Sequence, residues 1–160
     1  MEQITDKIVA ELDLFKVADS ADGGCSDIMT IEAVYFGDPG VIPVNSYPCF
    51  TVQPEQDVPV SETTGYEIRD LRLLITCLID AREFFNADVL EATGDRQLVQ
   101  AMGNLRRWLR RTANRRLDGL EGVREVRIDS TDYLVQVRDD VVAKSAQINV
   151  TVNRQYRREA

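Results

Sequence analysis

The stretch Glu125-Val-Arg-Ile-Asp-Ser-Thr-Asp-Tyr-Leu-Val-Gln-Val137 alternates apolar and polar side chains, a period typical of a β-strand with one buried face. Residues 129–132 interrupt the alternation with turn-forming side chains, and the pattern returns at residues 146–152. Three such strands in succession predict an antiparallel meander with one solvated face. The apolar positions are Val126, Ile128, Tyr133, Val135, Val137, Ala146, Ile148, Val150 and Val152.

Three further strands are predicted upstream of this region. Residues 66–79 begin with alternating side chains and become almost wholly apolar, as expected of a central strand. A helix over residues 71–85 is the competing interpretation, because a short apolar run fits both structures. Shorter strands rich in β-branched and aromatic residues are predicted at 30–36 and 49–52, the second ending before Pro54.

Two amphipathic helices are predicted at residues 2–17 and 95–117. Asp95 suits the N-cap of the second helix, and Gly119 follows where a helix C-terminus favours glycine. Each helix places its apolar residues on one face, and this spacing predicts that both pack on a core. The apolar residues are Ile4, Ile8, Val9, Leu12 and Phe15 in the first helix, and Leu98, Met102, Leu105, Leu109 and Ala113 in the second.

These elements predict a single α+β domain over residues 1–160, with a mixed or antiparallel sheet of about five to six strands. We expect the N-terminal helix and the long amphipathic helix to pack on one face. Pro54 and Pro59 fall in the polar segment 54–65, which is predicted to be an extended loop or arm. This segment either orders against a neighbouring subunit or is a mobile surface loop. The polar tail 154–160 is predicted to be flexible.

The composition argues against an enzyme. The sequence contains no histidine, which removes the usual general base near neutral pH and the commonest transition-metal ligand. Cys25, Cys49 and Cys77 are odd in number and far apart, so we expect buried, reduced thiols. The carboxylates match no metal-binding loop. The sequence therefore predicts no catalytic residue, no metal site and no cofactor.

The chain is also expected to fold in a cytoplasm without a membrane partner. No stretch approaches the roughly 18 to 20 apolar residues that span a bilayer. The N-terminal residues lack the basic region and apolar run of a secretory signal. The net charge of −8 argues against general binding of nucleic acid, because affinity for phosphate comes from basic surfaces.

A dense arginine cluster interrupts this acidic composition. Its members follow one another with no acidic residue between them, and most of them fan across the helix face opposite the apolar stripe. Three interpretations stay open: a solvated or internally paired face, contact with acidic residues of a neighbouring subunit, or binding of nucleic acid. The cluster consists of Arg106, Arg107, Arg110, Arg111, Arg115 and Arg116.

A resemblance to a known family comes from residues 31–54, Ile-Glu-Ala-Val-Tyr-Phe-Gly-Asp-Pro-Gly-Val-Ile-Pro-Val-Asn-Ser-Tyr-Pro-Cys-Phe-Thr-Val-Gln-Pro. The stretch resembles the first half of the tail terminator proteins of tailed bacteriophages. In that family a strand leads into a GDP…IP turn, and a YP or LP pair begins the next strand. The order of elements is also similar, including a long strand that ends at Asp80 and a C-terminal β-meander.

The resemblance implies a structural subunit of a virion, assembled in the host cytoplasm as a hexameric ring. Such a ring caps the tail tube and joins it to the neck, and DNA passes through it without specific binding. Alternatives are another neck component, such as a stopper or head-completion protein, or a nucleic-acid-associated module that uses the arginine helix. A third alternative is a small enzyme that uses Cys49, Cys77 or carboxylates. The predicted subunit-interface residues are Arg106, Arg107, Arg110, Arg111, Arg115, Pro54 and Pro59.

Overall fold

The computed structural model describes residues 1–82, 93–111, 116–117, 119–138 and 141–157. The chain has the predicted α+β fold, with five strands in one sheet. No helix within the described residues is long and apolar enough to cross a membrane. The elements are α1 (Glu2–Val17), β1 (Ala33–Phe36), the 3-10 helix η1 (Val44–Ser46), β2 (Cys49–Glu62), β3 (Tyr66–Asp80), α2 (Thr93–Arg110), β4 (Val123–Arg138) and β5 (Val141–Arg157).

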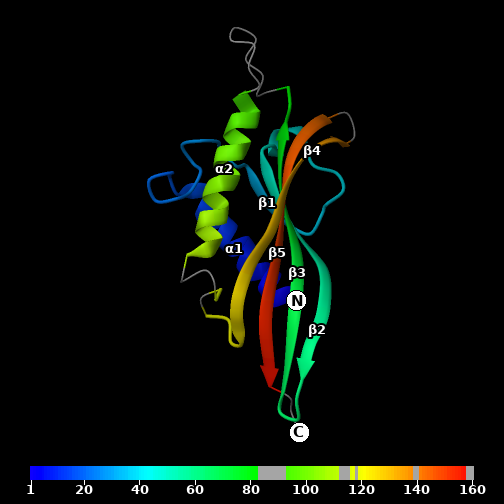
Figure 1. The fold of residues 1–160 in the computed structure, drawn as a ribbon. Helices are drawn as coiled ribbons and strands as arrows, with labels where there is room; N and C mark the ends of the chain where they lie inside the picture. Colours follow the sequence, from blue (N-terminus) through cyan, green and yellow to red (C-terminus); the bar gives the residue numbers. More distant parts are fainter. Residues whose placement is uncertain (83–92, 112–115, 118, 139–140, 158–160) are drawn as a thin grey trace.

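The sheet has the strand order β1-β2-β3-β5-β4, so the last strand of the chain lies beside the long central strand β3. Only β1 and β2 run parallel, and every other neighbouring pair is antiparallel. Both helices cover the same face of the sheet (Figure 1). The expected packing of the helices on one face is confirmed.

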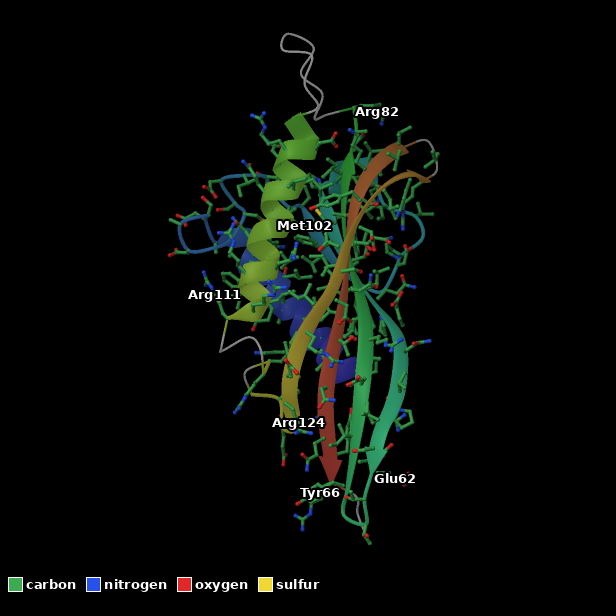
Figure 2. The ribbon with its side chains drawn as sticks, viewed as in Figure 1. Glu62, Tyr66, Arg82, Met102, Arg111 and Arg124 are labelled. Atoms are coloured by element: carbon green, nitrogen blue, oxygen red, sulfur yellow. The ribbon has the colours of Figure 1, made fainter. Side chains whose placement is uncertain are left out.

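The main core fills the space between the helices and this face of the sheet. The apolar stripe of α1 lies over β1 and β2, while α2 lies over β3, β4 and β5. Met102 points from α2 toward the sheet (Figure 2) and is fully buried. Each large apolar side chain buried in this way stabilises the fold by about 1.5–3 kcal/mol. The buried helix residues are Ile4, Ile8, Leu12, Phe15, Leu98, Ala101, Met102, Leu105 and Leu109.

The meander prediction is wrong in its number of strands. Residues 129–132 form no turn, because β4 continues from Val123 to Arg138 beside β5. A register shift between Ile128 and Ser130 absorbs the irregular residues instead. An extra residue in one strand reverses which side chains face the core. This reversal explains why the apolar positions of β4 are even-numbered before the shift and odd-numbered after it.

The prediction of an irregular loop at 54–65 is also wrong. β2 runs on to Glu62 and forms a long antiparallel hairpin with β3, in which only residues 63–65 form the connection. Pro54 and Pro59 stay within the strand, because each lies at a register shift. A proline at such an irregularity costs no regular ladder hydrogen bond. The rival helix over 71–85 is wrong as well, since β3 reaches Asp80.

Two other boundaries differ from the sequence prediction. α2 ends at Arg110, where the backbone N–H of Arg111 donates to the Trp108 carbonyl in a tight last turn. Ala113 and Arg115, predicted to lie on this helix, are outside the described residues. The tail predicted to be flexible begins as strand, because β5 pairs with β3 through Arg157.

A second, smaller core lies on the opposite face of the sheet. Because β1 and β2 are parallel, segment 37–48 must return the chain to the starting end of β1. Ile42 and Tyr47 of this segment are buried against the sheet beside Leu78 and Ala143. The segment therefore covers the upper part of the outer face and leaves the lower part exposed to solvent.

Candidate interaction surfaces

The arginine face of α2 is exposed, as predicted. Arg106, Arg107 and Arg110 all point to solvent, and Arg107 donates a 3.3 Å hydrogen bond to the Gly103 carbonyl. No ion pair joins any of these three side chains to a carboxylate within the described residues. These guanidinium groups are therefore available to a partner.

Arg111 differs from the rest of this face. Its guanidinium lies 4.7 Å from the centroid of the Trp108 ring and donates to the Asp22 carbonyl. The Trp108 ring in turn packs edge-on against Phe15, with ring centroids 5.8 Å apart, and its Nε1 donates to Glu11. Trp108 therefore fastens α2 to α1, while Arg111 fastens the end of α2 to the loop that follows α1. Trp108 is not a free ring on which a nucleic-acid base could stack.

The open edge of the sheet carries an apolar patch. β4 is the outermost strand at this edge, so one row of its backbone N–H and C=O groups has no strand partner among the described residues. Around its second half, several apolar side chains are 42–74% exposed. A shallow groove of about 330 Å³ between the start of α2 and β4 belongs to this patch. We call this set the edge patch: Val99, Tyr133, Leu134, Val135, Val137 and Val142.

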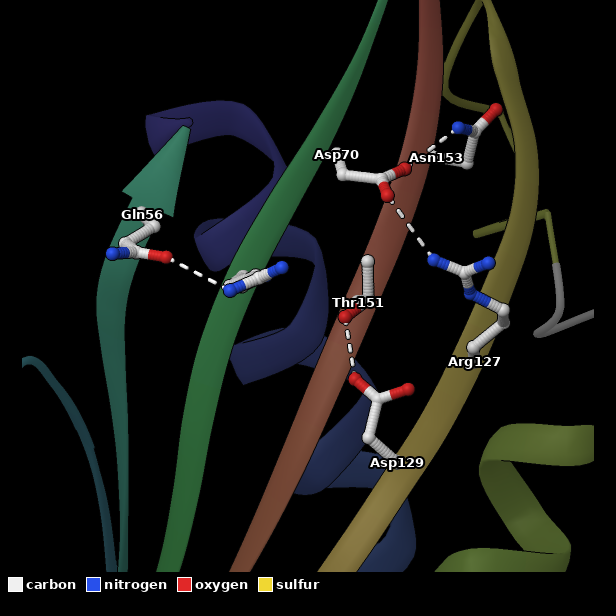
Figure 3. A network of polar contacts seen from close by, with 7 residues as sticks. Gln56, Asp70, Arg127, Asp129, Thr151 and Asn153 are labelled. Carbon is white, nitrogen blue, oxygen red and sulfur yellow. Dashed lines mark hydrogen bonds and ion pairs between the residues drawn. The ribbon is translucent and has the colours of Figure 1, made fainter. Parts of the chain in front are cut away.

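The lower part of the outer face is polar and internally bonded. Asp70 on β3 accepts from Arg127 of β4 at 3.1 Å and from Asn153 of β5 at 2.7 Å, and Thr151 donates to Asp129 at 2.5 Å (Figure 3). Through these cross-strand contacts the polar side chains form hydrogen bonds with one another. They make the face hydrophilic without a concentration of either charge.

A bidentate ion pair fixes segment 37–48 to β4. Both terminal nitrogens of Arg138 donate to the Asp38 carboxylate at 2.8 Å. These hydrogen bonds lower the pKa of Asp38 below its ordinary value, although partial burial opposes the effect. The turn at Gly37–Gly40 thus contributes a clamp that closes the second core.

The surroundings of the three cysteines disfavour the nucleophilic thiolate form. Burial raises the pKa of Cys25 and of Cys49 to about 12, and raises that of Cys77 well above its ordinary value. A reactive thiol requires a lowered pKa and exposure. All three are buried free thiols, as predicted. No cluster of three or more potential metal ligands occurs in the part of the chain that the structure describes.

A basic groove that sequence reasoning missed lies at the lower end of the sheet, where β4 begins and β5 ends. It has a volume of about 800 Å³, and Arg124 and Tyr66 lie at this end in Figure 2. Strand pairing creates the groove, because register places Tyr66 beside Arg157 and Val123 beside Arg154. We call it the arginine–tyrosine groove after its basic and aromatic lining residues, Tyr66, Arg116, Arg124, Arg154, Tyr156 and Arg157; Glu121, Gly122, Val123 and Gln155 complete the lining.

Gly122 shapes this groove. Its φ of +81° favours glycine, and an added Cβ would lie 2.2 Å from the Gln155 carbonyl oxygen. The close approach lets the Gln155 N–H donate to the Gly122 carbonyl at 2.8 Å. The turn before β4 is therefore held against β5, and the arginines on either side are brought together.

Comparisons with known proteins give likenesses among solved structures only. No protein-family model matches the chain, and no curated protein matches it. Among solved structures, the chain is similar to one in the virion of a native gene transfer agent particle. The two share 14% sequence identity over 91% of this chain and 93% of that chain, with a TM-score of 0.49. At this identity the likeness concerns the fold alone.

Proposed function

We propose that the chain is a structural virion subunit, a tail terminator that assembles as a ring, caps the tail tube and joins it to the neck. The observation that carries the assembly part is the edge patch on β4. Apolar side chains grouped on an open edge strand are a liability for a monomer, because they invite pairing with another chain. In an assembly the same strand is covered by a neighbour.

The tail-terminator part of the proposal rests on the resemblance of residues 31–54. β1 leads directly into the turn at Gly37–Gly40, and β2 begins immediately after Tyr47–Pro48, as in the motif. One feature departs from it, since β2 continues beyond Pro54. The part of the resemblance between β1 and β2 falls on a segment that is packed against the sheet, and this supports the proposal.

The exposed arginines supply a second contact surface in this proposal. Arg106, Arg107 and Arg110 have no carboxylate partner within the described residues, and their planar forks suit carboxylates of a neighbouring subunit. Pro54 and Pro59 lie on the β2–β3 hairpin, which extends past the helices (Figure 1) and gives a neighbour a strand to contact. Arg111 is set aside as an interface residue, because its guanidinium is held within the subunit by the Trp108 ring and the Asp22 carbonyl.

The test compares two valines of equal exposure. Val135 in the edge patch is 67% exposed, and Val17 at the end of α1 is 68% exposed. In light scattering of the purified protein, Val135→Glu should abolish the oligomer, while Val17→Glu should leave it intact. If both variants assemble like the wild type, the edge patch is not the interface.

A different neck component, a stopper or head-completion protein, is the alternative within the same class. It shares the assembly surface and differs in its position on the particle. Electron microscopy of tails grown without the chain separates the two. If the chain caps the tail tube, tails grown without it should be uncapped and vary in length. If it is a stopper or head-completion protein, the tails should be finished but should fail to join heads.

A further inference from the structure

We propose that the arginine–tyrosine groove binds the phosphodiester backbone of a nucleic-acid strand. The inference goes beyond the proposed assembly role and does not depend on it. It concerns the lower end of the sheet, whereas the edge patch lies around the second half of β4. Nothing in the tail-terminator proposal assigns this groove a ligand.

The charge of the groove is the first argument. Four arginines, Arg116, Arg124, Arg154 and Arg157, line it beside one carboxylate, Glu121. Within the described residues no ion pair joins any of these arginines to a carboxylate. Arg154 instead donates to neutral oxygens, the Glu121 carbonyl at 3.0 Å and the Gln3 side chain at 3.3 Å. Arginines left without an anion in a concave site are suited to phosphate, which they bind through strong charge-assisted hydrogen bonds.

The aromatic side chains are the second argument. The Arg154 guanidinium lies 4.9 Å from the centroid of the Tyr156 ring, a cation–π contact that fixes both groups at the groove wall. Tyr66 also lines the groove, is 48% exposed and pairs with Arg157 across β3 and β5. Grooves that combine basic residues with aromatic rings bind single strands, because the cations follow the backbone and the rings stack on bases.

An acidic polypeptide is the competing ligand, and the groove favours nucleic acid over it. A nucleic-acid strand offers a phosphate at every nucleotide, which suits arginines drawn from three separate segments of the chain. Carboxylates of a peptide would use the arginines but gain nothing from stacking on Tyr66. The net charge of −8 opposes binding, and because each arginine–phosphate contact displaces counterions, affinity should fall steeply as salt rises.

The experiment measures the fluorescence anisotropy of a labelled oligothymidylate across a salt series. The oligonucleotide is longer than roughly 16 nucleotides, the most that such a site spans. The wild type should bind at low salt. Arg124→Glu/Arg157→Glu should weaken binding about tenfold or more and reduce the logarithmic salt slope by about 1.4, or 0.7 for each lost phosphate contact. Arg154 is left intact because it holds the 121–122 turn.

The matched control is Arg106→Glu/Arg110→Glu, which changes the net charge equally on the arginine face of α2. It should reduce binding much less, because α2 offers no groove and its neighbouring Trp108 ring packs on Phe15. A labelled duplex of the same length tests the backbone contribution alone and should bind with less affinity than the single strand.

Three outcomes would overturn the proposal: no binding by the wild type at low salt, an equal loss in the α2 control, or tighter binding of labelled polyglutamate through the same two arginines. The last outcome would assign the groove to an acidic protein. Circular dichroism melting checks folding, and Arg124→Gln/Arg157→Gln replaces the reversal variant if that variant unfolds. Assembly state is recorded in parallel, so loss of the ring and loss of binding are read separately.

Discussion

The two faces of the sheet are built from the same strands, yet they hold opposite kinds of side chain. On the helix face, Leu73, Ile75 and Ile148 are buried beneath α1 and α2. On the lower outer face, neighbouring positions of the same strands carry Asp70 and Asn149, which bond only to other surface groups. Stability is therefore concentrated on one side, and the outer face and the open edge are left for contacts.

The largest expected effect comes from the helix face. Leu105→Ala should lower the free energy of unfolding by about 2–5 kcal/mol, because it removes a fully buried side chain and leaves a cavity. The adjacent exposed Arg106→Ala should change it by less than about 0.5 kcal/mol. Urea unfolding followed by circular dichroism measures both. Comparable effects of the two variants would contradict the assignment of the core.

The upper outer face, closed by the Asp38–Arg138 clamp, should show a smaller effect that depends on pH. The folded pKa of Asp38 is lowered by Arg138, so the pair stabilises the fold above the unfolded value of about 3.8. This contribution is lost as pH falls through the folded pKa. Asp38→Asn should therefore be less stable than the wild type at neutral pH, with the difference vanishing in acid. An equal difference at both pH values would show that the charge pair is not its source.

The same clamp should control thiol reactivity on the outer face. Burial and a pKa of about 12 make Cys49 slow to react with a thiol reagent at pH 8. Arg138→Gln should loosen segment 37–48 and speed the labelling of Cys49, while Cys77 on the helix face keeps its slow rate. Mass spectrometry of labelled peptides separates the two sites. Equal acceleration at Cys77 would indicate general destabilisation instead of local opening.

The smallest effect is expected on the exposed polar face. Asn153→Ala removes one 2.7 Å hydrogen bond to Asp70, which keeps its contact with Arg127. Because water can replace the lost donor, the free energy of unfolding should fall by no more than about 0.5–1.5 kcal/mol. Thermal unfolding measures the change. A loss as large as that of Leu105→Ala would contradict the division between the two faces.

Periodicity in the sequence was enough to predict the helices, the central strand and the α+β class. It could not predict the continuity of β4, because the residues at 129–132 have turn propensity, and only pairing with β5 stabilises them as a strand. The sequence also predicted a loop at 54–65, because prolines usually end a strand. In the structure these prolines lie at register shifts within β2. In both places, strand pairing in the folded protein overrides the local preference of the residues for a turn or loop.

The two basic surfaces also differ in how far the sequence predicts them. The arginine face of α2 was visible in the sequence, because helical spacing is short-range. The arginine–tyrosine groove was not, since its members come from residues near 66, 116–124 and 154–157 and meet only through strand register. The interface role stays a prediction for Arg106, Arg107, Arg110, Arg111, Arg115, Pro54 and Pro59. Arg111 is better explained as a link from the end of α2 to the loop after α1.

The central claim is that the open edge of this sheet is covered by another copy of the chain. Native mass spectrometry over a concentration series tests it most directly. The account predicts a closed oligomer at six times the 18.1 kDa mass of the chain, which Val135→Glu converts to the monomer. A wild-type protein that stays monomeric at every concentration, or an oligomer that Val135→Glu leaves unchanged, would contradict it.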